Sequence, residues 1–402
     1  MKATTQTRHT RRYDIDALRV IAFGLLILYH CGMFYVADWG WHIKSNYTAT
    51  WLQEPMMFLN QWRMSLLFVI SGLALALVEH RYSRLKLAGR RLWRLMLPLL
   101  FGMAVVVAPQ HYFEALNKGL IDPGFWNFYG RYLTFQDFPG EAWGGENVIV
   151  WSWNHLWYLP YIIFYTLLAL VCGPALRAAG IDSWFRSLRG PFLVFLPLIP
   201  LLLNGLFVFP SFPGITHDLI SDAYAHIMYG TLFIYGYLVG ADAGWWEALE
   251  SRRRALLTTA ICAYLLLRTQ EFWLGENPDR LLETLSLVSI YLNPWVWILA
   301  VMAFAFRYLN RPQAWIAYAT AAVFPWYILH QTLTVVLGGT LSPMSLGPVL
   351  EPASVVGGTV LGCYVLYEYV IRRVVWLQPL FGMPIKTAPP VERPVSRDRV
   401  NE

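Results

Sequence analysis

Ten stretches of about 17–25 predominantly apolar residues constrain the fold of this chain more than any other feature. The hydrocarbon core of a bilayer is about 30 Å thick, so a helix needs about 20 residues to cross it. Backbone polar groups in lipid must be hydrogen-bonded internally, and such segments are therefore helical. The stretches are 17–36, 56–79, 93–109, 155–173, 191–209, 222–240, 255–272, 285–306, 314–336 and 352–371. We expect an all-α, polytopic membrane protein with about ten transmembrane helices.

The distribution of charge agrees with this prediction. Charged residues make up 14% of the chain, whereas a soluble domain typically has about 25%. Of the 31 Lys and Arg residues, 24 fall in the two tails and alternate connections, and four fall in the other connections. Positive residues collect on the cytoplasmic side of membrane proteins, so we expect both termini to be cytoplasmic. The net charge of +6 forms no basic stripe, which argues against nucleic-acid binding.

The apolar stretches form one predicted unit. We expect a single transmembrane domain over residues 13–380, between a cytoplasmic tail at 1–12 and a disordered, Pro-bearing cytoplasmic tail at 381–402. The first stretch is interpreted as a retained signal anchor, because no small-residue cleavage site follows it. Residues 110–153 are predicted to form the longest external loop. The four cysteines lie in or beside apolar stretches without C-x-x-C spacing, so no disulfide framework or zinc site is indicated.

The first apolar stretch contains Asp16, Arg19 and His30. Eleven residues of helix separate Arg19 from His30 by about 16.5 Å along the axis and about 20° around it, so both lie on one face. Ionisable residues are costly inside a membrane and commonly mark a functional path. We interpret the pair as a polar path with His30 as general base. The alternative is structural: His30 bonds a neighbouring helix, and Asp16 neutralises Arg19.

Further candidates follow in the next segments. Arg63 and Ser71 share a broad face of the second stretch, although a Ser-Gly pair is also typical of helix packing. Ser71 lies in no G-x-S-x-G motif, which argues against a hydrolase nucleophile. Arg91 and Arg94, three residues apart, present two guanidinium groups suited to phosphate. The alternative for this pair is anchoring to anionic lipid.

His155, His330 and Glu368 are candidates for a wet polar cavity within the spans. Three histidines could suggest a metal site, but no two of them have helical i, i+3 or i+4 spacing, so we predict no metal. His42 lies in the first external connection and is interpreted as an interfacial residue. Nucleotide-binding and metalloprotease motifs are absent from the sequence.

Taken in order, these motifs resemble those of the acyltransferase family 3 integral membrane proteins, and more closely the branch with periplasmic glucan succinyltransferases. The resemblance covers most of the chain. It is carried by Asp16-Ala17-Leu18-Arg19, Arg19-x10-His30, Trp41 to Ser45, Arg63-Met64, Phe68 to Gly72, Arg91-x-x-Arg94, His155 to Leu159, Ile328-Leu329-His330, Leu366-Tyr367-Glu368 and Leu380-Phe381-Gly382.

The resemblance implies a multi-pass enzyme of the bacterial inner membrane. Such an enzyme moves an acyl group from cytoplasmic acyl-CoA to a hydroxyl of a periplasmic or cell-surface carbohydrate. Acyl-CoA is a co-substrate, and no bound cofactor is expected. The acyl group is succinyl or acetyl, and the oligomeric state is left open.

The resemblance also assigns roles to individual residues. His30 is the base, Arg19 contacts the donor or the acyl group, and Arg91 and Arg94 bind the CoA phosphates. Ser71 has a positioning role. For a succinyl donor, Arg19 or Arg63 is available to the far carboxylate.

Two departures from the branch concern this site. Tyr158 stands where Phe is usual, and Gln331 follows His330 where a second His can occur. The second departure bears on the choice between succinyl and acetyl.

Two other classes of protein compete with an enzyme. A proton-coupled carrier or flippase for an anionic or sugar substrate would use intramembrane His and Arg residues to relay protons or bind its cargo. Such a carrier typically shows repeat symmetry, which this sequence lacks. A sensor or scaffold without catalysis is the third class, and it predicts that replacing His30 has no effect.

Overall fold

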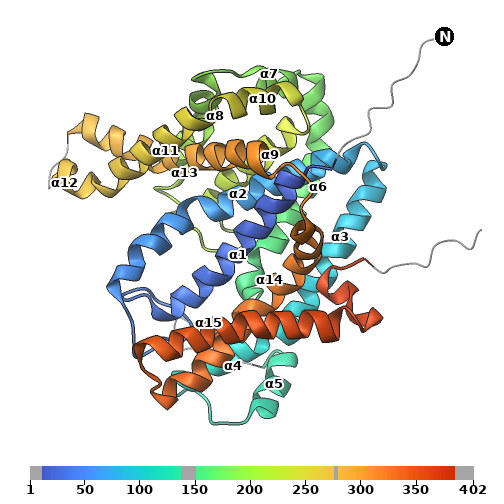
Figure 1. The fold of residues 1–402 in the computed structure, drawn as a ribbon, viewed down its shortest axis with the longest axis vertical. Coiled ribbons are helices and arrows are strands. Elements are labelled where there is room, and N and C mark those ends of the chain that lie inside the picture. The colour runs from blue at the N-terminus through green and yellow to red at the C-terminus, as the bar shows by residue number, and fades with distance from the viewer. Residues whose placement is uncertain (1–10, 137–150, 276–278, 385–402) are drawn as a thin grey trace, which may run out of the picture.

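The computed structural model describes residues 11–136, 151–275 and 279–384. Over these residues the chain is helical and contains no β-strand, which confirms the predicted all-α class. Figure 1 shows the helices packed along one another. Their bounds are α1 Tyr13–Tyr35, α2 Gln53–Glu79, α3 Arg84–Phe101, α4 Ala108–Asn117, α5 Phe125–Leu133, α6 Tyr158–Ala178, α7 Ile181–Ser187, α8 Phe192–Leu203, α9 Ala223–Val239, α10 Ala243–Ser251, α11 Arg253–Arg268, α12 Gln270–Leu274, α13 Arg280–Leu309, α14 Ala314–Leu341 and α15 Gly347–Val365.

Seven helical segments of the described chain are long and apolar enough to cross a membrane. They are Tyr13–Tyr35, Thr50–Glu79, Arg84–Asn117, Asn154–Ala178, Arg280–Leu309, Ala314–Met344 and Gly347–Ile371. The other three predicted spans correspond to shorter helices, of which α9 has 17 residues and α11 has 16. The described chain begins and ends on the same side of the bundle, to the right in Figure 1. The number of ten crossings stays a prediction.

The third span differs from its prediction at both ends. The sequence placed it at 93–109 and an external loop at 110–153, but the helical segment runs over Arg84–Asn117. A π-helical turn at Gly102–Val106 joins α3 to α4. Pro109 does not end the segment, because it lies in the first turn of α4, where a missing N–H is tolerated. The first part of the predicted loop is therefore helical, and α5 follows within it; residues 137–150 lie outside the described chain.

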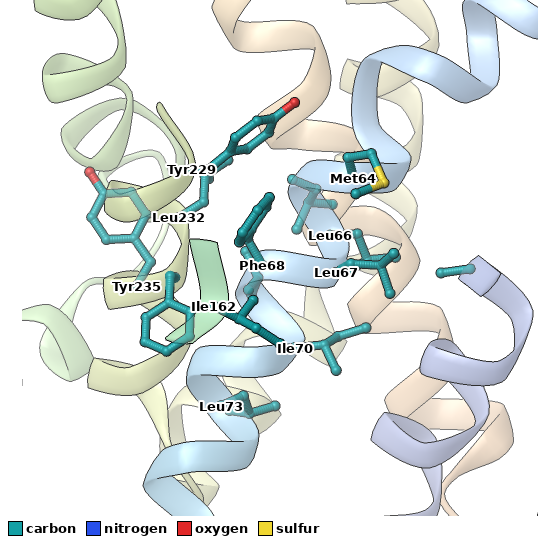
Figure 2. Close-up of a cluster of buried hydrophobic side chains, with 14 of the residues drawn as sticks. Met64, Leu66, Leu67, Phe68, Ile70, Leu73, Ile162, Tyr229, Leu232 and Tyr235 are labelled. Atoms are coloured by element: carbon teal, nitrogen blue, oxygen red, sulfur yellow. The ribbon is translucent and has the colours of Figure 1, made fainter. Parts of the chain in front are cut away.

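Helices α2 and α9 form a close pair at the centre of the core. A Cβ added to Gly72 would lie 1.8 Å from the carbonyl oxygen of Phe233, and one added to Gly236 would lie 2.0 Å from that of Val69. Small residues let membrane helices approach this closely. Phe68 of α2 points toward α9 (Figure 2), and its ring stacks on Tyr229 with centroids 4.4 Å apart.

Helix α1 is the element around which the functional residues gather. It packs against α2 on one side and α14 on another, and α14 in turn packs against α4 and α15. The start of α1 is held by Arg12, which bonds the buried carboxylate of Asp14 and stacks 3.9 Å from the Trp246 ring of α10. Segments that are distant in sequence thus meet at the polar face of α1.

Candidate functional site

His30 of α1 and His330 of α14 form a hydrogen-bonded pair, which we call the histidine pair. His30 Nδ1 lies 2.7 Å from His330 Nε2, and the planes of the two rings are nearly parallel, with an angle of 6° between them. His330 is fully buried, whereas His30 is only partly buried. The pair therefore has one fully buried member and one member that is less completely buried.

Hydrogen bonds to the backbone define which nitrogen of each ring carries the proton. His330 Nδ1 lies 2.7 Å from the carbonyl oxygen of Tyr327. A carbonyl only accepts, so Nδ1 of His330 must be protonated, and in the neutral ring Nε2 has the lone pair. His30 then donates its Nδ1–H to that lone pair. The free lone pair of neutral His30 is consequently on Nε2, the position from which a general base would act.

His155 supports the histidine pair from the short 3₁₀ helix Asn154–Trp157, which directly precedes α6. Its Nε2–H donates to the carbonyl oxygen of Ile328 at 3.1 Å, and Gln110 donates to its Nδ1 at 3.2 Å. Its ring meets that of His330 edge to face at 5.5 Å. The Tyr327 hydroxyl in turn donates to the His155 carbonyl oxygen at 2.8 Å. Both ring nitrogens of His155 are thus occupied, which suits a positioning residue better than a base.

A polar network of amide groups extends from the histidine pair toward the predicted extracytoplasmic side. Gln331 Nε2 lies 3.0 Å from Gln110 Oε1, 2.9 Å from Asn154 Oδ1 and 3.0 Å from His42 Nε2. Gln110 and Gln331 are almost fully buried. Buried amides of this kind hold the elements that carry them in a fixed arrangement. This network connects the segment between α1 and α2, helix α4, the 3₁₀ helix Asn154–Trp157 and helix α14.

His42 and Glu114 end this network. His42 Nδ1 lies 2.5 Å from Glu114 Oε2, and Lys118 pairs with the other carboxylate oxygen at 2.7 Å. The connection that carries His42 is held by Lys44, which donates to the carbonyl oxygens of Met33 and Val36 at the end of α1. Burial lowers the pKa of the Lys44 ammonium.

Arg63 of α2 lies beside the histidine pair. Its guanidinium stacks over the ring of Tyr29 at 4.1 Å, and its charge acts on both His30 and His330. The side chain is 1% exposed. The sequence predicted that Arg63, like Arg91 and Arg94, contacts the acyl-CoA donor; the structure places Arg63 beside the histidines and away from the other two arginines' partners.

Arg19, Arg91 and Arg94 form a second group near the start of α1, which we call the cationic cluster. Arg19 lies close enough to Arg91 and Arg94 for charge repulsion to act on both. Arg94 donates through Nε to the Gly382 carbonyl oxygen at 3.0 Å. Asp16 is 3.8 Å from Arg19 and 2.8 Å from Arg11. Only one of the three arginines of the cluster thus has an acidic partner among these contacts.

Ser71 and Tyr158 lie between the cationic cluster and the histidine pair. The Tyr158 hydroxyl donates to the carbonyl oxygen of Leu67 at 3.1 Å and lies 2.5 Å from Ser71 Oγ. Because the Tyr158 proton is used on the carbonyl, the Ser71 hydroxyl donates to Tyr158. The Tyr158 ring also meets that of Tyr327 edge to face at 6.3 Å. Ser71 is therefore placed to orient Tyr158, and its positioning role stays a prediction.

Glu368 does not join the predicted polar cavity. Its carboxylate pairs with Arg372 at 2.5 Å and accepts a hydrogen bond from Tyr318 at 3.1 Å, near the start of α14. His155 and His330 do come together, as described above. Over the described residues, no group of three His, Cys, Asp or Glu side chains is placed to hold a metal ion.

A family model described as an acyltransferase domain, of the acyltransferase 3 type, matches residues 12–368. The chain belongs to the acyltransferase 3 family. Glucans biosynthesis protein C of Escherichia coli K12 is 25% identical over 348 residues, which cover 83% of this chain and 84% of the relative. The protein of the same name from Escherichia coli O139:H28 is 26% identical over 354 residues, with the same shares covered. No solved structure matches the chain significantly.

Membership of the acyltransferase 3 family confirms the resemblance drawn from the motifs and makes this chain a membrane acyltransferase by family. Sequence reasoning did not find Gln110, Glu114 and Asn154, because all three fell in the predicted external loop or at its end. The spacing of Gln110 and Glu114 would place them on one helix face, had the third span been extended past Pro109. His42 was noted but not connected to the site.

Proposed function

We propose that this member of the acyltransferase 3 family transfers a succinyl or acetyl group from cytoplasmic acyl-CoA to a hydroxyl of a periplasmic glycan. The family supports acyl transfer, and the similarity to glucans biosynthesis protein C supports a glucan as acceptor. The apolar helices support a place in the bacterial inner membrane. The observation that carries the proposal is the histidine pair, in which the partly exposed His30 is oriented by the buried His330.

In the proposed reaction, His30 Nε2 takes the proton of the acceptor hydroxyl while its oxygen attacks the thioester carbonyl. The carbon–sulfur bond then breaks, and CoA leaves as a thiolate that recovers the proton from His30. The products are a glycan ester and CoA. A hydroxyl is a poor nucleophile until a base removes its proton, and a positioned base typically contributes about 10²–10⁴ in rate. Because His30 keeps its Nδ1–H on His330, the ring is held with the basic nitrogen free.

The cationic cluster is the proposed binding site for the phosphates of the donor. Arginine recognises phosphate through planar pairs of N–H groups, and three arginines that repel one another are stabilised by a polyanion. Tyr158 and Tyr327 connect this cluster to the histidine pair, so an acyl chain entering from the cluster would pass these rings to reach His30. The thioester end of the donor and the acceptor hydroxyl would then meet at His30.

The proposal is tested with purified protein, labelled succinyl-CoA or acetyl-CoA, and a periplasmic glucan. The wild-type protein should form labelled glucan ester, and His30→Ala should abolish ester formation while the folded protein remains. His226→Gln is the control, since His226 is another partly buried, hydrogen-bonded histidine but lies on α9. This control should keep its activity. If the wild-type protein transports a substrate and forms no ester with either donor, the enzyme proposal is wrong.

A further inference from the structure

Arg63 is a buried cation with no acidic partner among the residues that the structure describes. The side chain is 1% exposed, and its Nε and Nη1 atoms have no hydrogen-bond partner. A buried charge without a partner is strongly unfavourable, and in a membrane span it typically marks a functional site. An arginine cannot escape this cost by losing its proton under ordinary conditions. The structure thus contains an unsatisfied site for an anion.

The acidic residues of the neighbouring helices are already committed to other cations. On α2 itself, Glu54 pairs with Arg268 at 2.5 Å, and Glu79 pairs with Arg177 at 2.9 Å. On α1, Asp14 pairs with Arg12 and Asp16 with Arg11. Helix α14 contains no Asp or Glu. These four ion pairs mean that neither α1 nor α2 has an acid left to neutralise Arg63.

The groups that surround Arg63 are polar but carry no negative charge. Tyr29 presents its ring at 4.1 Å, and the charge of Arg63 acts on Tyr229, His30 and His330. A cation–π contact holds the guanidinium plane in place but leaves its N–H groups free to donate. The Tyr29 ring also lies 5.9 Å from the His30 ring, so the guanidinium of Arg63 is in the same region as the proposed base.

We infer that Arg63 binds the free carboxylate of a short dicarboxylic acyl group, such as succinyl, while the thioester carbonyl of that group lies at His30. This inference rests on the proposed function, and it makes Arg63 a specificity-determining residue. A carboxylate neutralises one guanidinium and accepts its N–H donors. The phosphates of CoA are too large and too highly charged for this buried position, and the cationic cluster is available to them. The carboxylate does not react: transfer breaks only the carbon–sulfur bond and forms only the ester bond.

The inference is tested by comparing succinyl-CoA with acetyl-CoA in the wild-type protein and in Arg63→Gln. We expect kcat/KM for succinyl-CoA to fall by about 100-fold in Arg63→Gln, because the buried carboxylate loses its charge-assisted hydrogen bonds. The fall in kcat/KM for acetyl-CoA should be at least about 10-fold smaller than the fall for succinyl-CoA, since acetyl has no carboxylate to lose. Arg63→Lys should recover part of the succinyl activity. Arg268→Gln, which also removes an arginine that contacts α2, should leave both donors unchanged.

Two further measurements separate this inference from a structural role and from the proposed function. Arg63→Met should melt at the same or a higher temperature than the wild type without ligand, because the variant no longer buries an unpaired charge. A large drop in melting temperature would assign Arg63 to the fold. Binding of succinyl-CoA and acetyl-CoA is measured without acceptor, and Arg63→Gln should weaken only the former.

Two outcomes would overturn the inference. If both donors lose activity equally in Arg63→Gln, Arg63 serves the common reaction centre and not the carboxylate. If the wild-type protein binds both donors equally, or Arg63→Gln changes neither, no carboxylate is bound there. Absence of ester with every donor would instead count against the proposed function, and the binding comparison would still decide the role of Arg63.

Discussion

Removing the ring of His330 tests whether the histidine pair makes His30 a base. His330→Leu keeps an apolar side chain in the buried position but offers no acceptor to His30 Nδ1–H. His330→Gln can place its amide oxygen near the former position of Nε2 and accept that hydrogen bond. The two variants therefore differ mainly in the 2.7 Å contact between His30 Nδ1 and His330 Nε2.

The expected loss of kcat depends on what the contact between His30 and His330 contributes to the reaction. If it contributed only the net energy of an ordinary hydrogen bond, about 1 kcal/mol, its loss would lower the rate by about 5-fold. It also fixes the tautomer and the orientation of His30, and loss of such an orienting partner costs about 10⁴ in the serine-protease triad. There the partner is a charged carboxylate, whereas His330 is neutral. We therefore expect kcat for His330→Leu to fall by about 10²–10³, which corresponds to about 2.7–4.1 kcal/mol.

The assay is steady-state ester formation by purified variants, with kcat and the donor KM measured separately. KM for the donor should change little in His330→Leu, since His330 is placed to act through His30. His330→Gln should be at least 10-fold more active than His330→Leu. Thr334→Val is the matched control, because Thr334 is equally buried one turn farther along α14 and its hydroxyl donates to the carbonyl oxygen of His330, not to a histidine ring. A wild-type kcat in His330→Leu, or equal loss in the Leu and Gln variants, would refute the reasoning.

The remaining predictions concern the proposed donor site, the contact between Ser71 and Tyr158, and the packing of α2 against α9. Replacing Arg91 and Arg94 by Gln should raise the donor KM by about 10–100-fold, because hydrogen bonds to charged groups contribute about 1.5–3 kcal/mol; an unchanged KM would leave these residues as membrane anchors. In a double-mutant cycle of Tyr158→Phe and Ser71→Ala, we expect the two changes in unfolding free energy to be coupled by about 0.5–1.5 kcal/mol, with no large loss of kcat. Loss of all activity in Ser71→Ala alone would contradict a positioning role. Gly236→Ala should destabilise the protein by about 1–3 kcal/mol, because the new Cβ would overlap the carbonyl oxygen of Val69. Thermal unfolding measures this effect, and an unchanged melting temperature would contradict the close packing of α2 and α9.

Hydrophobic periodicity and length were sufficient to predict the helical class, because lipid leaves the backbone few alternatives. They were not sufficient for the helix bounds near Pro109. There, a π-helical turn lets the segment continue, and side chains from elsewhere bond its carbonyl oxygens. Thr332 donates to Val106 and Tyr132 to Met103. Such support comes from tertiary packing and has no local signal.

The candidate site was predictable where it depended on one helix and unpredictable where it depended on contacts between helices. The shared face of Arg19 and His30 follows from their spacing. The pairing of His30 with His330, 300 residues away, does not. Helical spacing likewise could not show that Arg63 lies with the histidines, because α2 could place that face toward several neighbours. Glu368 was grouped with the histidines from its depth in the last span, but its ion pair with Arg372 places it apart from them.

Transfer across a sealed membrane tests the central claim most directly. The purified protein is reconstituted into vesicles that contain the acceptor glucan, and labelled acyl-CoA is added only to the outside. The account predicts that labelled ester accumulates on the enclosed glucan with the wild-type protein and not with His30→Ala. If ester forms only when donor and acceptor are on the same side of the membrane, or if His30→Ala is as active as the wild type, the account is wrong.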